Sequence, residues 1–226
     1  MRQELSKFEG LNLVTAYPDD YESGKKYPVI LFLHGSGSRS DDVNKLAANP
    51  FFKITTEHKD FPFILIAPQA LVNTTWYDFM PTLKRLVAEI YKRDDVDVER
   101  VYAMGASMGG YGTWQLAMSI PEAFAAIVPI CGGGMAWNTG RLANVDVWAF
   151  HGAKDRCVLC AESERMVAET NRRGGTAKLT IYPENAHNAW SDTFANRAVF
   201  DWLLSHRKSS PVSTASGELD DSKKYG

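Results

Sequence analysis

The chain has 226 residues, 45% hydrophobic and 23% charged, and its 25 Lys and Arg against 27 Asp and Glu give a formal net charge of -2. This composition is that of one globular domain with a hydrophobic core, and it excludes collagen-like, low-complexity and fully disordered chains. The balanced charge, with no basic stripe along the sequence, argues against nucleic acid or a membrane surface as a partner.

The beginning of the chain gives no sign of export. Residues 1–10 carry charges where a signal peptide requires an unbroken apolar stretch, and the tightest apolar cluster, residues 29–33, is too short to span a bilayer. We therefore expect a cytoplasmic location. The segment Leu11–Tyr17 and a turn at residues 22–26 together predict an antiparallel hairpin at the edge of a sheet.

The rest of the chain alternates between buried strands and amphipathic helices. In chain order, the pattern predicts strands at 27–34 and 63–68, a helix opened by Pro81 with the stripe Leu83, Leu86, Val87, Ile90 and Tyr91, a strand at 100–106, a helix at 108–120, strands at 124–130 and 145–150, a helix at 161–172, a strand at 177–182 and a helix at 195–203. Strands that are almost entirely apolar are covered on both faces. The prediction is an α/β fold with a mostly parallel central sheet, helices on both faces and ligands at the carboxyl ends of the strands.

We expect a single catalytic domain over residues 1–208. Residues 209–226 begin with a serine-rich stretch, continue with a run of charges and lack apolar periodicity, so they predict a disordered C-terminal tail.

The three cysteines do not suggest a disulfide framework. Cys131, Cys157 and Cys160 are an odd number in a chain too long to need covalent staples, which favours reduced thiols. Cys157 and Cys160 form a C-x-x-C pattern, but a zinc site requires a second pair of ligands and a redox site usually opens a helix directly after a strand. We expect no metal and no organic cofactor.

Ser107 is the strongest chemical signal in the sequence. It lies in the pattern Gly105-Ala106-Ser107-Met108-Gly109, where a predicted strand ends and a predicted helix begins. A serine on so sharp a turn needs glycine on both sides for steric reasons, and the turn raises the hydroxyl above the edge of the sheet. We expect Ser107 to be a nucleophile.

A serine nucleophile requires a histidine base and a carboxylate that orients it. His187 follows the last predicted strand, and Asp155 lies in the loop after the strand at 145–150. The order Ser107, Asp155, His187 is the order typical of this arrangement. An alternative role for Asp155 is to cap the following helix or to pair with Arg156.

The remaining histidines and one other carboxylate are weaker candidates. We expect His58 on the surface in a polar stretch, His206 at the end of a helix, His151 as a buried packing or hydrogen-bonding group, and Asp192 as the carboxylate of a helix N-terminus. A backbone site for an oxyanion is expected from the turn His34-Gly35-Ser36-Gly37, with the amides of Ser36 and Met108 as donors.

These residues resemble the α/β-hydrolase family, and within it the small single-domain serine esterases near the dienelactone hydrolase and carboxylesterase branches. The resemblance runs from about Tyr27 to Arg207 and is carried by residues 31–35 (LFLHG), 105–112 (GASMGGYG), 150–155 (FHGAKD) and 187–190 (HNAW). It implies hydrolysis of carboxylic esters through an acyl-enzyme, with Ser107 as nucleophile, His187 as base and then acid, and Asp155 as orienting carboxylate.

The chain departs from the resemblance at two points. In similar enzymes a valine commonly follows the loop that carries the acidic residue, where this chain has Cys157 and Val158. Cys157 is therefore expected near the site as an oxidisable thiol. A dienelactone hydrolase in the strict sense has a cysteine nucleophile, so Ser107 argues against that subgroup.

The substrate class is limited by what surrounds the expected site. Gly35, Trp76, Trp137 and Trp190 are candidates for substrate contact, although aromatic side chains near strand ends are often core residues. Because the sequence has no long amphipathic insertion for a lid, we expect short or soluble ester substrates. We also expect a monomer or homodimer. The alternatives are a peptidase or thioesterase with the same triad, and a non-catalytic binding module on this fold.

Overall fold

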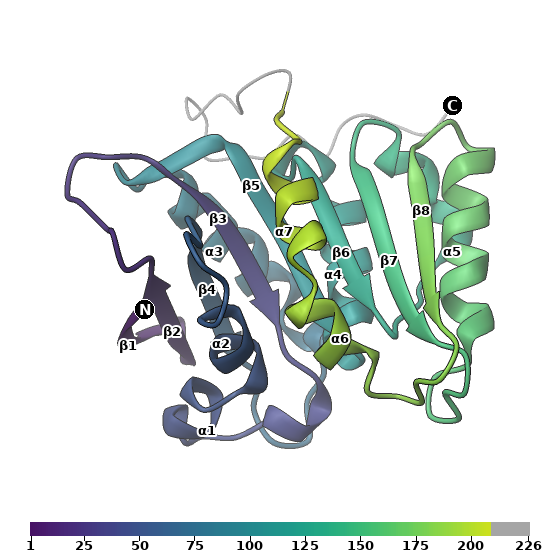
Figure 1. Cartoon of the computed structure of the whole chain (residues 1–226), viewed down its shortest axis with the longest axis horizontal. Coiled ribbons are helices and arrows are strands. Elements are labelled where there is room, and N and C mark those ends of the chain that lie inside the picture. Colours follow the sequence, from purple (N-terminus) through teal and green to yellow (C-terminus); the bar gives the residue numbers. More distant parts are fainter. Residues whose placement is uncertain (209–226) are drawn as a thin grey trace.

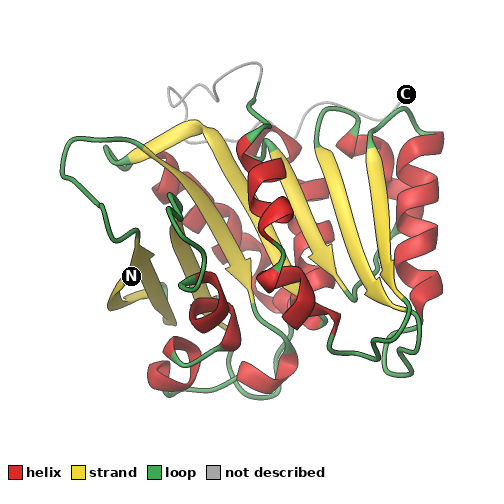
Figure 2. Cartoon of the chain, in the orientation of Figure 1, coloured by secondary structure: helices red, strands yellow, loops and turns green. Residues whose placement is uncertain are grey.

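The structure is a computed structural model that describes residues 1–208; the expected tail at residues 209–226 lies outside the described residues. The described residues form an eight-stranded sheet in the order β1-β2-β4-β3-β5-β6-β7-β8. Helices cover both faces of this sheet (Figures 1 and 2). The predicted fold class, a mostly parallel sheet with an antiparallel N-terminal edge, is confirmed.

The elements follow the predicted alternation closely. The strands are β1 (Arg2–Phe8), β2 (Leu11–Tyr17), β3 (Tyr27–Leu33), β4 (Ile64–Gln69), β5 (Val96–Ala106), β6 (Ala126–Ile130), β7 (Asp146–Gly152) and β8 (Ala177–Tyr182). The α-helices are α1 (Val43–Ala47), α2 (Pro50–Thr55), α3 (Met80–Tyr91), α4 (Met108–Ser119), α5 (Cys160–Arg172), α6 (Ala189–Ala195) and α7 (Arg197–Leu204). Short 3₁₀ turns are η1 (Ser36–Ser38), η2 (Trp76–Phe79), η3 (Pro121–Ala123) and η4 (Ala136–Leu142).

The N-terminal hairpin is where the sequence prediction was wrong in detail. Its turn is Glu9–Gly10 rather than residues 22–26, and it joins β1 to β2. Glu9 and Gly10 both have positive φ, 45° and 88°, and such a two-residue turn matches the twist of the flanking strands. The strand β2 lies between β1 and β4, so the segment 18–26 only connects β2 to β3.

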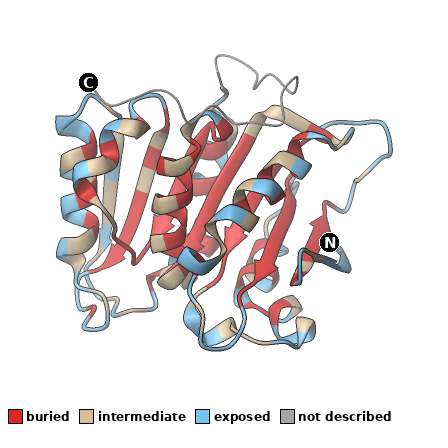
Figure 3. Ribbon diagram, turned by 180° about the vertical axis from the view of Figure 1, so that it is seen from behind, coloured by how far each residue is buried: buried red, intermediate tan, exposed pale blue. Residues whose placement is uncertain are grey.

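The core is divided into two layers by the sheet. Alternate residues of β3 point to opposite faces: Leu31 packs with helices α3 and α4, whereas Phe32 packs with α2, α6 and α7. The helices present buried residues to the sheet and exposed ones to the outside (Figure 3). No helix within residues 1–208 is both long and apolar enough to cross a membrane.

The strand order reverses at the centre of the sheet. The chain runs from β3 to β4 on one side and then returns to β5 on the other side of β3, so β3 has β4 and β5 as its neighbours. In parallel sheets a crevice opens where the order reverses, outside the carboxyl ends of the strands. The loops after β3 and β5, which contain Ser36 and Ser107, meet there.

Candidate active site

Ser107 stands on a strained turn between β5 and α4. Its φ of 56° and ψ of -118° lie in a region that non-glycine residues rarely occupy. The turn is tight because a Cβ on Gly105 would lie 2.2 Å from the carbonyl oxygen of Gly109, and one on Gly109 would lie 1.7 Å from that of Leu33. Both glycines are therefore required by close backbone contact, as the sequence pattern predicted.

The structure brings the side chains of Ser107, His187 and Asp155 into one hydrogen-bonded chain. The Oγ of Ser107 lies 2.8 Å from Nε2 of His187, and Nδ1 of His187 lies 2.7 Å from Oδ2 of Asp155. The three residues follow β5, β8 and β7 respectively, at the same edge of the sheet. The His187 side chain is 24% exposed and that of Asp155 is fully buried, so the serine end of this hydrogen-bonded series is the end open to solvent.

The carboxylate of Asp155 is held at both oxygens. Oδ1 accepts hydrogen bonds from the backbone N–H groups of Cys157 and Val158, at 2.9 and 3.0 Å, while Oδ2 faces His187. Burial alone would raise the pKa of this carboxyl, but the hydrogen bonds from His187 and the two amides outweigh it and lower the pKa below its ordinary value. Asp155 therefore both caps the turn and orients His187, and it is ionised at neutral pH.

The two amides expected for an oxyanion site belong to the loops that meet at the strand reversal. Ser36 is the exposed first residue of η1, and Met108 is the first residue of α4. An N–H in the first turn of a helix has no acceptor within the helix, and the helix dipole favours negative charge at that end. Ser36 lines a cavity at this position, and Met108 directly follows Ser107, which lines the same cavity.

His34 anchors the loop that carries Ser36. The backbone N–H of Ala70 donates to Nε2 of His34 at 3.0 Å, so Nδ1 carries the hydrogen and donates to the carbonyl oxygen of Gly35 at 2.7 Å. Burial lowers the pKa of His34 to about 4, so the ring is neutral at neutral pH. The indole Nε1 of Trp76 donates to the carbonyl oxygen of His34 and fixes the same loop from a second direction.

A cavity of about 240 Å³ opens beside the serine. Its wall contains Ser107 and His187, the loop Gly35–Ser38, the start of α2 and aromatic side chains of β3 and α6. The lining residues are Phe32, Gly35, Ser36, Gly37, Ser38, Asn49, Pro50, Ala106, Ser107, His187, Trp190 and Phe194. This surface is largely apolar, and its polar groups gather at the serine and near Asn49, whose Nδ2 donates to the Oγ of Ser38.

The three tryptophans proposed for substrate contact have different surroundings. Trp190 lines the cavity, and its ring meets that of His187 edge to face at 5.2 Å between centroids. Trp76 is fully buried in the core beneath the loop, so it supports the site without contacting the cavity. Trp137 is 60% exposed on η4 and is not part of the cavity wall.

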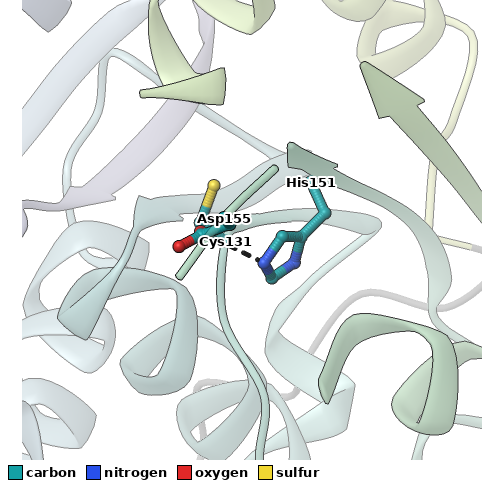
Figure 4. Close-up of side chains that lie close together, drawn as sticks. All are labelled: Cys131, His151 and Asp155. Atoms are coloured by element: carbon teal, nitrogen blue, oxygen red, sulfur yellow. Dashed lines mark ion pairs between the residues drawn. The ribbon is translucent and has the colours of Figure 1, made fainter. Parts of the chain in front are cut away.

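The structure also reveals a buried cluster of Cys131, His151 and Asp155 (Figure 4). Their possible ligand atoms lie within 4.8 Å of one another, a separation that admits a metal ion. The donors are nevertheless committed: Asp155 accepts from His187 and two amides, and burial together with the charge of Asp155 raises the pKa of the Cys131 thiol to about 12. A cysteine binds a metal ion as the thiolate, which the raised pKa of Cys131 disfavours. The cluster is therefore better suited to hydrogen bonding.

The weaker sequence candidates lie elsewhere. His58 is partly buried rather than on the surface, with Nε2 2.7 Å from the carbonyl oxygen of Phe194. His206 faces the carbonyl oxygen of Trp202 at the end of α7, and Asp192 accepts from Asn185 in the first turn of α6. Cys157 is exposed, Cys160 is partly buried, and both are free thiols.

Comparisons with known proteins identify a family and several relatives. The model of the dienelactone hydrolase family matches residues 56–199. A bifunctional acetylxylan esterase/xylanase of Neocallimastix patriciarum is 24% identical over 133 residues, which cover 57% of this chain and only 19% of that protein. A probable feruloyl esterase C of Aspergillus niger is 23% identical over 195 residues, 84% of this chain and 72% of that protein.

Among solved structures, a thermostable esterase superposes with a TM-score of 0.81 at 28% sequence identity. The match covers 92% of this chain and 63% of that chain, so the esterase contains further residues that have no counterpart here.

Proposed function

The chain belongs to the dienelactone hydrolase family, and we propose that it is a serine hydrolase that cleaves carboxylic esters through an acyl-enzyme on Ser107. The observation that carries this proposal is the hydrogen-bonded chain from Ser107 through His187 to Asp155. A serine hydroxyl becomes a useful nucleophile only beside a base, and the base needs a partner that fixes its tautomer.

The first half of the reaction transfers the acyl group to the enzyme. Nε2 of His187 accepts the hydroxyl proton of Ser107 while the oxygen attacks the ester carbonyl carbon. Asp155 holds the hydrogen of His187 on Nδ1 and stabilises the imidazolium that forms. The imidazolium then gives its Nε2 proton to the departing alkoxide, which leaves as the alcohol, and the acyl group stays on Ser107.

The second half repeats the steps with water. His187 accepts a proton from a water molecule that attacks the acyl carbon, and it returns the proton to the Oγ of Ser107 as the carboxylic acid is released. In both halves the carbonyl oxygen gains negative charge. We assign the amides of Ser36 and Met108 to this oxygen, since preorganised backbone donors of this kind contribute about 3 kcal/mol each to transition states.

The cavity limits the acyl group. About 240 Å³ of largely apolar space is enough for a short acyl chain or one substituted aromatic ring. The names of two relatives, an acetylxylan esterase and a feruloyl esterase, refer to one small and one aromatic acyl group. We propose short or soluble esters as substrates, with the acyl group beside Trp190 and Phe194.

A labelling experiment tests this function. The chain is expected to react with a fluorophosphonate probe at Ser107 and to hydrolyse p-nitrophenyl acetate, and both reactions should vanish in Ser107→Ala. Ser119→Ala, at the far end of α4, is the matched control and should behave as wild type. Full esterase activity in Ser107→Ala would show that the proposed nucleophile is wrong, and faster turnover of a matched p-nitroanilide would favour a peptidase.

A further inference from the structure

His151 contacts the same carboxylate as His187. Its Nε2 lies 3.3 Å from Oδ2 of Asp155, and both side chains are completely buried (Figure 4). We propose that His151 is a positioning residue, which donates its Nε2–H to Asp155 and thereby fixes the carboxylate that orients His187. This inference rests on the proposed function, because it assigns His151 a part in the same reaction.

The location of the hydrogen on His151 follows from its neighbours. Nε2 faces two oxygens, the backbone carbonyl of Val158 at 2.9 Å and the carboxylate of Asp155 at 3.3 Å. Carbonyl and ionised carboxylate oxygens can only accept. The hydrogen must therefore be on Nε2, where it forms a hydrogen bond with the carbonyl of Val158 and lies near the carboxylate of Asp155.

The other nitrogen of the ring, Nδ1, contacts a residue of α5. Nδ1 of His151 lies 2.7 Å from the Oγ of Ser163, and the same hydroxyl lies 2.9 Å from the carbonyl oxygen of Gly132. Ser163 is fully buried, so this hydroxyl has no competition from bulk solvent. If Ser163 donates to Nδ1, the ring carries its hydrogen on Nε2 alone; if Ser163 donates to Gly132, Nδ1 needs a hydrogen of its own. In both cases Nε2 of His151 remains a donor, because its own neighbours are acceptors.

Polar hydrogens surround the carboxylate of Asp155 on all sides. Two amides serve Oδ1, those of Cys157 and Val158, and two imidazoles serve Oδ2, those of His187 and His151. A carboxylate has about four lone-pair sites, so little freedom remains for it to rotate. Cys131 also lies beside Asp155, and because its pKa is raised, the thiol keeps its hydrogen and donates it weakly to the same carboxylate.

The loss of one donor should change the catalytic behaviour in two ways. A carboxylate that is free to rotate aligns His187 less well, which lowers kcat. A carboxylate with one donor fewer also attracts the positively charged imidazolium of His187 more strongly. Proton uptake at Nε2 becomes more favourable, so the acid-side fall of kcat/KM should move to higher pH. A residue with a merely structural role would lower stability without moving this pH profile.

Two substitutions of His151 distinguish the effect of losing the N–H donor from the effect of losing the imidazole ring. His151→Leu removes the donor, and we expect kcat for p-nitrophenyl acetate to fall about ten- to a hundredfold with a smaller change in KM. His151→Gln places an amide N–H near the position of Nε2 and should recover most of the loss, together with the wild-type pH profile. Equal behaviour of the Leu and Gln variants, or an unchanged profile in His151→Leu, would overturn the inference.

Thr170→Val is the control for stability. It removes another buried hydroxyl of α5, which donates to the carbonyl oxygen of Met166 and has no contact with Asp155. This variant should unfold more easily than wild type and keep the wild-type pH profile.

Nitrogen-15 NMR of the histidine rings in the full chain tests the hydrogen position without any substrate. The signals that disappear in His151→Gln identify this ring, and they should show a hydrogen on Nε2. A ring protonated at Nδ1 alone would overturn the inference even in an active enzyme. Conversely, retained activity in Ser107→Ala would refute the proposed function and leave the NMR result standing, so the two failures are distinguishable.

Discussion

The Oγ of Ser107 lies 2.8 Å from Nε2 of His187, although 80 residues separate them in the sequence. The contact depends on the sheet, since the two residues follow β5 and β8 and only β6 and β7 lie between these strands. This hydrogen bond is formed only when the strands from β5 to β8 are paired in the correct register. Activity is therefore a sensitive measure of correct folding.

The carboxylate at position 155 should be essential for turnover and dispensable for folding. In Asp155→Asn the amide oxygen can still accept from the N–H groups of Cys157 and Val158, but the NH₂ group faces His187 and favours the wrong tautomer. We expect kcat to fall by about 10³- to 10⁴-fold. Steady-state kinetics and the denaturation midpoint of the same preparations check both halves of this expectation. Asp192→Asn is the matched control, and an equal loss there would contradict the assignment of Asp155.

The backbone contact at Gly109 should be intolerant of a methyl group. A Cβ at this position would lie 1.7 Å from the carbonyl oxygen of Leu33, which belongs to a central strand and cannot move away. Gly109→Ala should lose more than about 4 kcal/mol of unfolding free energy or fail to fold. Gly140→Ala is the control, since its Cβ would meet only Arg173 at 3.6 Å. Urea titrations of the two variants provide the comparison, and similar midpoints would show that the elbow is looser than described.

The stability of the fold should depend on the neutral state of His34. Its pKa is lowered to about 4 in the folded chain, against 6.5 as the ordinary value, so the unfolded chain binds the proton first as the pH falls. The free energy of unfolding should therefore decrease between about pH 6.5 and 4, by up to ~3 kcal/mol from this group alone. Denaturant titrations across this range measure the slope.

A variant isolates this contribution. His34→Asn cannot take up a proton, so its unfolding free energy should change less with pH over the same range than that of wild type, although its stability at neutral pH is lower. Parallel slopes for wild type and His34→Asn would contradict the placement of a neutral His34 in the core.

The size of the cavity should determine which acyl chain length the protein prefers. Trp190 forms part of the cavity wall, and its replacement by alanine opens space beside Ser107. Trp190→Ala should raise kcat/KM for p-nitrophenyl hexanoate relative to the acetate by about tenfold, with some loss of kcat because the ring also supports His187. Trp137→Ala, which removes an exposed side chain outside the cavity wall, should leave the ratio unchanged. An unchanged ratio in Trp190→Ala would place the acyl group elsewhere.

Much of the fold could be predicted because its strands are apolar on both faces and its helices are amphipathic. The ends of these elements also indicated where Ser107, Asp155 and His187 lie, since each follows a strand at the same edge of the sheet. The strand β1 escaped prediction because its side chains are mostly exposed, and the short helices α1, α2 and α6 have too few turns for a clear period.

Other features depend on contacts that no local pattern reveals. Trp76 was a candidate for substrate contact, but its indole is held in the core by a hydrogen bond to His34, which lies 42 residues away. The relation of His151 to Asp155 had one local signal, a spacing of four residues across a tight turn, and needed Ser163 of α5 and Val158 to define it.

The positive φ of Ser107 implies a trade between durability and chemistry. A serine held at φ 56° and ψ -118° costs the folded chain about 1–3 kcal/mol, whereas glycine adopts this conformation without steric strain. Selection for thermal endurance alone would therefore replace the nucleophile with glycine. A chain that retains serine here accepts a lower melting temperature so that its hydroxyl stays in the reactive position.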